Sequence, residues 1–227
     1  MPETQQKSLY FPSTHPKNRN KFCRALQNKL TRIDSDRPLI FLCIGSDRAT
    51  GDSLGPLVGQ RLAAGLAYSN YNEKINVKQE TSRNIFYRTG RTPFCSKKAV
   101  VYGTLRQTVH AGNLTSTLAE IHNRYDNPYI IAIDASLGVP EHIGCVTLGN
   151  GSLRPGIGVS HDLPEAGDMH ITGIVNHSTQ NNHFTLQTTK LLTVMELAVF
   201  IADGILEALH VSPALQSPQK SHFVNIL

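Results

Sequence analysis

Short continuous apolar runs alternate along the chain with stretches in which apolar residues recur at helical spacing. The first run, residues 39–44, is apolar almost throughout and ends at Gly45, which predicts a strand buried on both faces. Behind Ser53, a residue suited to cap a helix, apolar residues recur every one to four positions: Leu54, Leu57, Val58, Leu62 and Leu66. The pattern therefore opens with a strand, a polar loop and a helix.

Similar runs predict the rest of a folded core. In chain order they are a strand over 99–102, a helix over 111–125, strands over 129–133, 143–148 and 170–175, and a closing helix over 186–209. Alternation of strands and helices predicts a mostly parallel sheet covered on both sides. The strand over 143–148 follows a short turn, so we expect it to be antiparallel and nearer an edge. One stripe of the closing helix is expected to face the core: Leu191, Met195, Ala198, Ala202, Ile205 and Leu209.

We place the folded domain at residues 38–210. Three segments are expected to lie outside its packed core, and one of them is an insertion within the domain. Residues 1–37 are polar and broken by three prolines, with only a short helical pattern around 22–30, so we expect a flexible N-terminal arm. Residues 69–98 lack periodicity and are interpreted as a basic insertion, and residues 211–227 as a loose tail. The arm alone holds eight Lys and Arg residues against three acidic residues, so the net charge of +5 comes from the attachments.

Length and composition restrict the class of protein. A chain of 227 residues with 40% hydrophobic residues fits one folded α/β domain with attachments. Basic residues that recur on a helix face and interleaved aromatic residues are not evident, which argues against specific nucleic-acid binding. The four cysteines include no CxxC pair, and no apolar run reaches the roughly 18 to 20 residues that span a bilayer. We therefore expect a soluble, cytoplasmic protein with no membrane partner.

Two acidic residues stand where ligands bind in open α/β sheets, at the carboxyl ends of strands. Asp52 lies in the loop after the first strand, and Asp134 directly follows the strand over 129–133. Two close carboxylates can share a proton to activate water, or they can hold a metal. The alternative for Asp52 is a structural role, accepting backbone N–H groups at the start of the following helix. Asp134 needs a partner, because an acid at the end of a buried strand is costly to desolvate.

Other motifs of catalysis are missing from the chain. The loop from Gly45 to Pro56 matches neither a Walker A loop nor GxGxxG, and neither HExxH nor GxSxG occurs. The Gly-rich loop over 155–164 can cover the crevice and bring His161 or His170 near the carboxylates, although a single histidine is more often structural. Hydrolysis would therefore have to run through the carboxylates.

Four segments of the chain resemble the YyaC-type sporulation proteins of spore-forming Firmicutes over about residues 38–210. They are residues 43–58, 101–105, 131–138 and 167–176. That family is similar to the germination protease that degrades small acid-soluble spore proteins and, more remotely, to the hydrogenase maturation proteases. The resemblance implies a three-layer α/β/α domain with a mixed, mostly parallel central sheet, of the phosphorylase/hydrolase-like kind.

The resemblance to the germination protease implies that Asp52 and Asp134 are catalytic and act without a metal. The hydrogenase maturation proteases add a histidine and use the nickel of their substrate. In this chain both His161 and His170 are candidates for the position of that histidine. We expect no metal and no cofactor here. Around the acidic pair, eight residues are expected to bind substrate: Gly45, Ser46, Asp47, Thr50, Gly156, Gly158, His161 and His170.

These features together predict a sporulation-associated endopeptidase of the aspartic type, located in the cytoplasm of the sporulating cell or forespore. Its expected substrate is a protein or peptide, with small acid-soluble spore proteins as the first candidates. The alternative is a non-catalytic sporulation factor that binds a peptide or protein partner in the same cleft. A third hypothesis is metal-dependent maturation of another protein, and the oligomeric state stays open.

Overall fold

The computed structural model describes residues 9–34, 36–80, 99–156 and 163–209. Within them a single six-stranded sheet has the order β1-β5-β6-β4-β2-β3. The strands are β1 (Leu9–Pro12), β2 (Leu39–Cys43), β3 (Ala99–Tyr102), β4 (Tyr129–Gly138), β5 (Cys145–Asn150) and β6 (Met169–His177). β6, β4, β2 and β3 pair in parallel, whereas β5 is antiparallel to both β6 and β1. The predicted mixed, mostly parallel sheet is confirmed, and so is the antiparallel strand near one edge.

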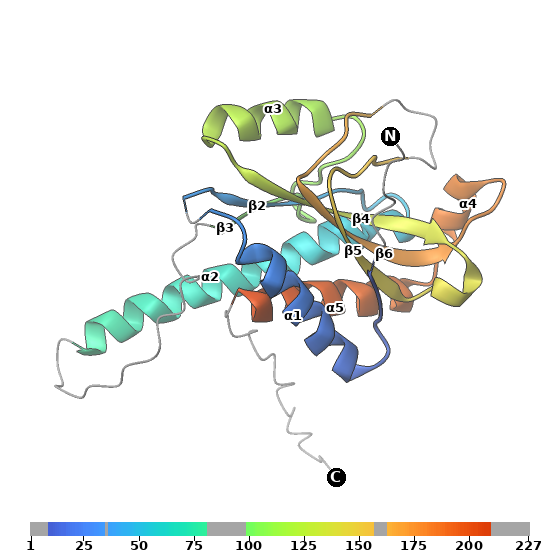
Figure 1. Cartoon of the computed structure of the whole chain (residues 1–227). Helices are drawn as coiled ribbons and strands as arrows, with labels where there is room; N and C mark the ends of the chain where they lie inside the picture. Colours follow the sequence, from blue (N-terminus) through green and yellow to red (C-terminus); the bar gives the residue numbers. More distant parts are fainter. Residues whose placement is uncertain (1–8, 35, 81–98, 157–162, 210–227) are drawn as a thin grey trace, which may run out of the picture.

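Helices cover both faces of this sheet, so the domain has the three predicted layers (Figure 1). One face carries α1 (Pro16–Leu30), α2 (Leu54–Glu80) and α5 (Leu191–Ala208), and the other carries α3 (Leu114–Arg124). The short helices η1 (Gly51–Ser53), η3 (Pro140–His142) and α4 (Asn182–Gln187) lie in the connections. Within the described residues, no helix combines the length and apolar character that crossing a bilayer requires.

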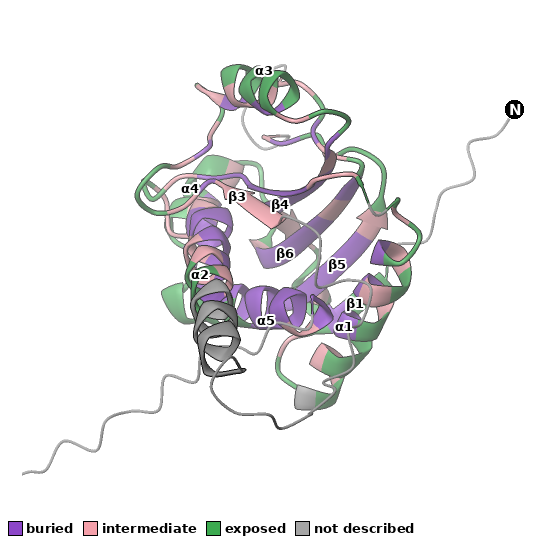
Figure 2. Cartoon of the chain, turned by 90° about the vertical axis from the view of Figure 1, so that its left-hand side faces the viewer, coloured by how far each residue is buried: buried purple, intermediate pink, exposed green. Residues whose placement is uncertain are grey.

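The inner strand β2 shows why a continuous apolar run was needed. All five of its residues are buried, because successive side chains point to opposite faces and both faces are covered. Figure 2 shows similar burial along β5 and β6 and along α5. Leu39, Phe41 and Cys43 pack in the core formed with α1, α2 and α5. Ile40 and Leu42 pack in a second core with α3. The sheet therefore separates two hydrophobic cores.

The expectation of a flexible arm over residues 1–37 is wrong for residues 9–30. β1 forms the sheet edge beside β5, and α1 buries Phe22, Leu26 and Leu30 completely. Phe22 also stacks edge-on against Phe11, with ring centroids 5.5 Å apart. These buried side chains recur every four residues, and polar and basic residues of the outer helix face separate them in the sequence. That face exposes Lys17, Lys21 and Arg24, so basic residues do recur on one helix face, contrary to expectation.

Several element boundaries differ from the predicted ones. β4 does not stop at Asp134 but continues to Gly138, because it goes on pairing with β6 beyond the end of β2. The closing helix is interrupted at 188–190, which separates α4 from α5. α2 continues to Glu80 and so includes the start of the expected 69–98 insertion. The rest of that insertion and the 211–227 tail lie outside the described residues.

The expected core stripe of the closing helix is right in its second half and wrong in its first. Ala198, Ala202 and Ile205 are buried as expected. Leu191 and Met195 are exposed, and the first turns of α5 bury Val194 and Leu197 instead. The sheet therefore meets a different face of the helix at its amino end than the apolar spacing alone indicated.

Candidate functional site

Asp52 and Asp134 meet at the carboxyl edge of the sheet. β2 and β4 are parallel neighbours whose pairing ends at Cys43 and Ile133, so Asp134 is the first residue of β4 beyond the end of β2. The chain leaves β2, turns, and presents Asp52 from η1 at the same edge. Both side chains line the same two cavities. The prediction that the two acids share one cleft is confirmed.

The loop after β2 holds Asp52 in place. The backbone N–H and the Oγ hydroxyl of Ser46 both donate hydrogen bonds to Oδ2 of Asp52, each at 2.7 Å. Gly45 makes this turn possible: its φ is +139°, and a Cβ there would lie 2.0 Å from the carbonyl oxygen of Asp52. Asp52 is thus tied to the loop that precedes it rather than acting as a cap for the helix that follows.

Asp134 is a buried acid, with 7% of its surface exposed. Burial raises the pKa of its carboxyl group to about 8, and the negative charge of Asp52 adds to the rise. The backbone N–H of Ala135 donates to Oδ1 at 2.7 Å and offsets a smaller part of it. At neutral pH Asp134 therefore keeps its proton beside the second carboxyl group, which is the arrangement of a pair that holds one proton.

Two cavities open on either side of this pair. The first has a volume of about 410 Å³ and is lined by residues of three loops and of α4, among them Ser46, Arg48, His110, Gly112, Gly156 and His183. The second has a volume of about 250 Å³ and mixes apolar and hydroxyl side chains: Ser136, Leu137, Leu153, Thr172, Ser178 and Leu186. Both cavities share Asp52, Asp134 and Gly156, so the two acids lie where they meet.

The structure brings some of the predicted substrate-binding residues to the cleft and leaves others away from it. Gly45, Ser46 and Gly156 line it. Thr50 and Asp47 line neither cavity. The carbonyl oxygen of Thr50 accepts a 2.7 Å hydrogen bond from the hydroxyl of Ser53.

Of the two predicted histidines, only His170 belongs to the described residues, and it does not line the cleft. His170 lies on β6 outside both cavities, where its ring Nδ1 pairs with the carbonyl oxygen of Gly151 at 3.1 Å. His161 and the predicted Gly158 fall at 157–162, outside the described residues. For His170 the expected role at the carboxylates is wrong, because its ring is turned toward the hairpin between β5 and β6.

The histidines that do line the cleft, His110 and His183, were not predicted. His110 follows β3 at the carboxyl edge of the sheet, and His183 belongs to α4, which follows β6 at that same edge. The Nδ1 atom of His110 accepts a 3.1 Å hydrogen bond from the backbone N–H of Gly112, so the neutral ring carries its proton on Nε2. The available signal was topological, since any loop after a parallel strand reaches this edge.

The described side chains around the pair do not form a metal site. Among the described residues, no three or more His, Cys, Asp and Glu side chains are placed to hold one ion together. The donors nearest the two acids are instead hydroxyl and backbone N–H groups, from Ser46 and Ala135. What the arrangement offers chemically is a protonated carboxyl group, that of Asp134, which lines the same cavities as a second carboxyl group, that of Asp52.

Sequence comparison relates this chain to known proteins over most of its length. Residues 10–72 and 92–204 match the family described as "Protein of unknown function (DUF1256)". The chain is 40% identical over 174 residues to "Uncharacterized protein YyaC" of Bacillus subtilis (strain 168), covering 77% of this chain and 71% of that protein. The family match includes Asp52, Asp134 and the helix α1 that the sequence analysis left outside the core. The chain therefore belongs to the DUF1256 family.

Proposed function

We propose that this protein is an endopeptidase that acts in sporulation and hydrolyses peptide bonds with Asp52 and Asp134. One observation carries the proposal: a buried aspartate with a pKa of about 8 lies beside a second aspartate in an open cleft. Perturbed acids in clefts are typical of catalytic sites. Since Asp134 is the member that keeps the proton, it is the acid of the pair and Asp52 is the base.

The mechanism follows from these two roles. Ser46 occupies Oδ2 of Asp52, which leaves Oδ1 to take a proton from a water molecule as the water attacks the scissile carbonyl carbon. Asp134 donates its proton toward the carbonyl oxygen and stabilises the charge that develops there. As the tetrahedral intermediate collapses, the proton held by Asp52 passes to the leaving amine and the C–N bond breaks. Asp134 regains its proton from the new carboxyl group.

The substrate of this reaction is proposed from the shape of the cleft and from the resemblance in sequence. A cavity on each side of the pair gives room for the peptide on both sides of the scissile bond. Resemblance to the germination protease makes small acid-soluble spore proteins the first substrates to test. The proposed location is accordingly the cytoplasm of the sporulating cell or forespore.

Cleavage by Asp→Asn variants tests this function. Purified protein is incubated with small acid-soluble spore proteins at pH 7, and the fragments are identified by mass spectrometry. Asp52→Asn and Asp134→Asn should each slow cleavage by about 100-fold or more, because each removes one proton-transfer group. Asp126→Asn, which changes an exposed acid in the turn before β4, is the matched control and should cleave like the wild type. Unaltered cleavage by Asp134→Asn would overturn the mechanism.

A second candidate function is peptide binding without hydrolysis. The observation that favours it is the same protonated Asp134, because its O–H group can donate a hydrogen bond to a peptide carbonyl without any reaction. Calorimetry that detects binding of small acid-soluble spore proteins, together with the absence of fragments of these proteins after prolonged incubation, would support this function. The Asp→Asn variants would then bind nearly as well as the wild type, since an Asn amide is also a donor.

A further inference from the structure

The exposed side of α1 carries only basic and amide side chains. Where the structure describes side chains of this helix, the exposed ones are Lys17, Asn20, Lys21, Arg24 and Asn28. Residues 4–33 of the chain hold seven Lys and Arg residues and no Asp or Glu. Spacings of four and three residues place Lys17, Lys21 and Arg24 on the same side of the helix. We call these three residues the basic face of α1.

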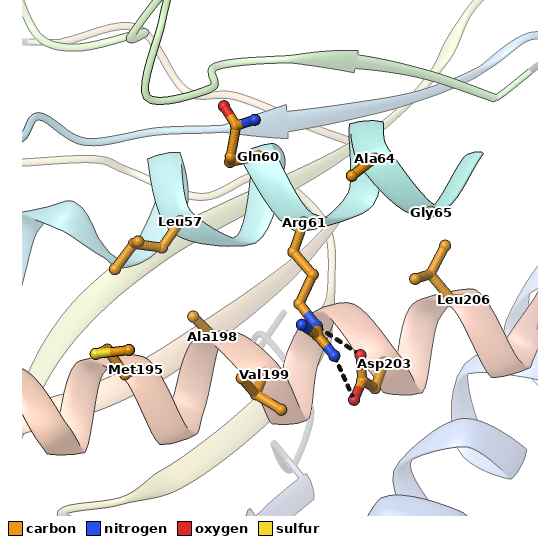
Figure 3. Close-up of a pocket in the computed structure, with 10 residues that line it drawn as sticks. All are labelled: Leu57, Gln60, Arg61, Ala64, Gly65, Met195, Ala198, Val199, Asp203 and Leu206. Atoms are coloured by element: carbon orange, nitrogen blue, oxygen red, sulfur yellow. Dashed lines mark hydrogen bonds and ion pairs between the residues drawn. The ribbon is translucent and has the colours of Figure 1, made fainter. Parts of the chain in front are cut away.

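Other cations of the same helical layer are neutralised within the chain. Arg61 of α2 donates two hydrogen bonds to Asp203 of α5, at 2.7 and 3.1 Å (Figure 3). Arg19, on the side of α1 that faces α5, pairs with Glu207 at 3.1 Å. No ion pair of this kind joins the basic face to any other residue that the structure describes. The positive charge of the basic face is therefore available to a partner.

The basic face also lies in the open. α1 is an end helix of its layer, because it packs on α5 and β1 whereas α2 packs on the other flank of α5 (Figure 1). The exposed parts of α1 lie on its outward side, at the margin of the domain (Figure 2). An extended partner can therefore run along this helix.

The chemistry of this side of α1 matches a nucleic-acid backbone. A basic stripe along one helix, in a chain with a pI of about 9.1, is the electrostatic footprint of a nucleic-acid-binding surface. Lys, Arg and Asn are side chains that contact phosphate oxygens. From Lys17 to Arg24 the helix rises by about 10 Å, and over that length a DNA duplex carries roughly six negative charges.

Two other polyanionic partners fit this surface less well. A helix that binds a bilayer surface places an apolar face among the lipids, but the apolar residues Phe22, Leu26 and Leu30 are already buried in the core. The centre of a protein interface is rich in aromatic residues and poor in Lys. The exposed side of α1 has the opposite composition among the residues described.

The form of the nucleic acid follows from the helix itself. Single strands are held by aromatic rings that stack on bases, and the described exposed residues of α1 include none. The major groove of B-form DNA admits an α-helix, whereas that of an RNA duplex is too narrow for side chains to read. Duplex DNA is therefore the favoured partner.

We propose that the basic face of α1 binds the phosphate backbone of duplex DNA without sequence preference. The residues of this face line neither of the cavities at Asp52 and Asp134. DNA binding is consequently independent of the proposed peptidase activity, and either can fail without the other.

Fluorescence anisotropy of a labelled DNA duplex of about 24 base pairs, titrated with the full chain at about 50 mM to 200 mM salt, tests the proposal. The wild type should bind two duplexes of unrelated sequence equally. The slope of log K against log salt should be about −3, because each neutralised phosphate contributes about −0.9. The double variant Lys21→Gln, Arg24→Gln should bind at least about tenfold more weakly at the lowest salt, with a slope near −1.

The matched control makes the same two changes of charge on the other side of the sheet. Arg106 and Arg124 are exposed in the loop before α3 and on α3, and the double variant Arg106→Gln, Arg124→Gln should bind DNA like the wild type. Circular dichroism melts verify that both double variants fold, as expected because all four side chains are exposed.

Three outcomes would overturn the proposal. A wild type that leaves the duplex unbound at about 50 mM salt, or that binds only vesicles rich in phosphatidylserine, would indicate that α1 serves no DNA. Tighter binding of the single strand or of an RNA duplex of the same sequence would contradict the choice of duplex DNA. Equal affinities of the Lys21→Gln, Arg24→Gln variant and the wild type would place DNA binding on basic residues elsewhere in the chain.

Discussion

Asp134 holds a proton because the fold places its carboxyl group where a negative charge is poorly solvated. Asp134 belongs to a strand of a sheet that is covered on both faces, and the charge of Asp52 acts on it. Burial makes the largest contribution to its raised pKa. A carboxylic acid that stays protonated at pH 7 can donate a hydrogen bond where an ordinary aspartate cannot. The proposed enzyme therefore needs no acidic compartment to run an aspartic mechanism.

The pH dependence of cleavage follows from that proton. Because Asp134 must be in its acid form, kcat/KM should fall above about pH 8, by about tenfold for each further pH unit. Rates measured from pH 5 to pH 10 on one peptide substrate check this. A rate that holds its neutral value up to pH 10 would contradict the assignment of Asp134 as the acid.

Ser46 is predicted to position the base. Ser46→Ala removes the hydroxyl that donates to Asp52 but keeps the backbone N–H that donates to the same oxygen. We expect kcat to fall by about tenfold with KM nearly unchanged, which corresponds to one hydrogen bond to a charged group. Ser116→Ala, which removes an exposed hydroxyl on α3, is the control. A Ser46→Ala variant with only a raised KM would indicate a role in binding substrate instead.

At the scale of elements, buried strands were predictable and a half-exposed helix was not. β2 and the first half of β4 could be identified because every residue of a doubly covered strand must be apolar or nearly so. Their carboxyl ends then indicated where Asp52 and Asp134 would meet. α1 was recognised only as a short helical pattern around 22–30 and was placed outside the core, because its inward residues are separated by Lys, Arg and Asn. Contact with β1 and α5 fixes its position.

His110 and His183 were missed for a related reason. Each belongs to a segment held by local side-chain hydrogen bonds, since the loop after β3 is fixed by the hydrogen bond from His110 N–H to the side chain of Asn113. α4 is likewise capped by Asn181, whose side chain accepts from the N–H of Phe184. No periodicity in the sequence marks such segments, so only their place after the parallel strands β3 and β6 could have indicated these residues.

The role of α1 can be tested by truncating one of its buried side chains. Phe22→Ala should destabilise the protein by about 3–5 kcal/mol, because Phe22 is fully buried against Phe11 and Phe200. Lys21→Ala, one position away on the exposed side, should change stability by less than about 0.5 kcal/mol. Urea unfolding measures both. Equal, small effects would show that the amino-terminal segment does not belong to the folded domain.

At the scale of the whole molecule, the folding unit runs from β1 to α5 and carries its two notable surfaces in different places. The cleft with the two acids lies at the carboxyl edge of the sheet, whereas the exposed apolar residues of α5 lie on the outside of one helical layer. The family match covers both, since it extends over residues 10–72 and 92–204.

Global stability should depend on pH through Asp134. Its pKa is about 8 in the folded protein against 3.8 for the free side chain, so between these values the folded state binds a proton that the unfolded state has lost. The free energy of unfolding should consequently fall as pH rises from 4 to 8. Asp134→Asn should lack this part of the fall, because it cannot ionise. Urea unfolding of both proteins at pH 5 and pH 8 checks the difference, and parallel pH slopes would contradict it.

The pKa of Asp134 itself, measured from the side-chain carboxyl ¹³C shift during an NMR titration, tests the central claim most directly. The account predicts a value near 8 in the wild type and a lower value, still above 3.8, in Asp52→Asn, since burial remains when the neighbouring charge is removed. A value near 3.8 in the wild type, or one unchanged by Asp52→Asn, would contradict the claim that the two acids share one proton in one cleft.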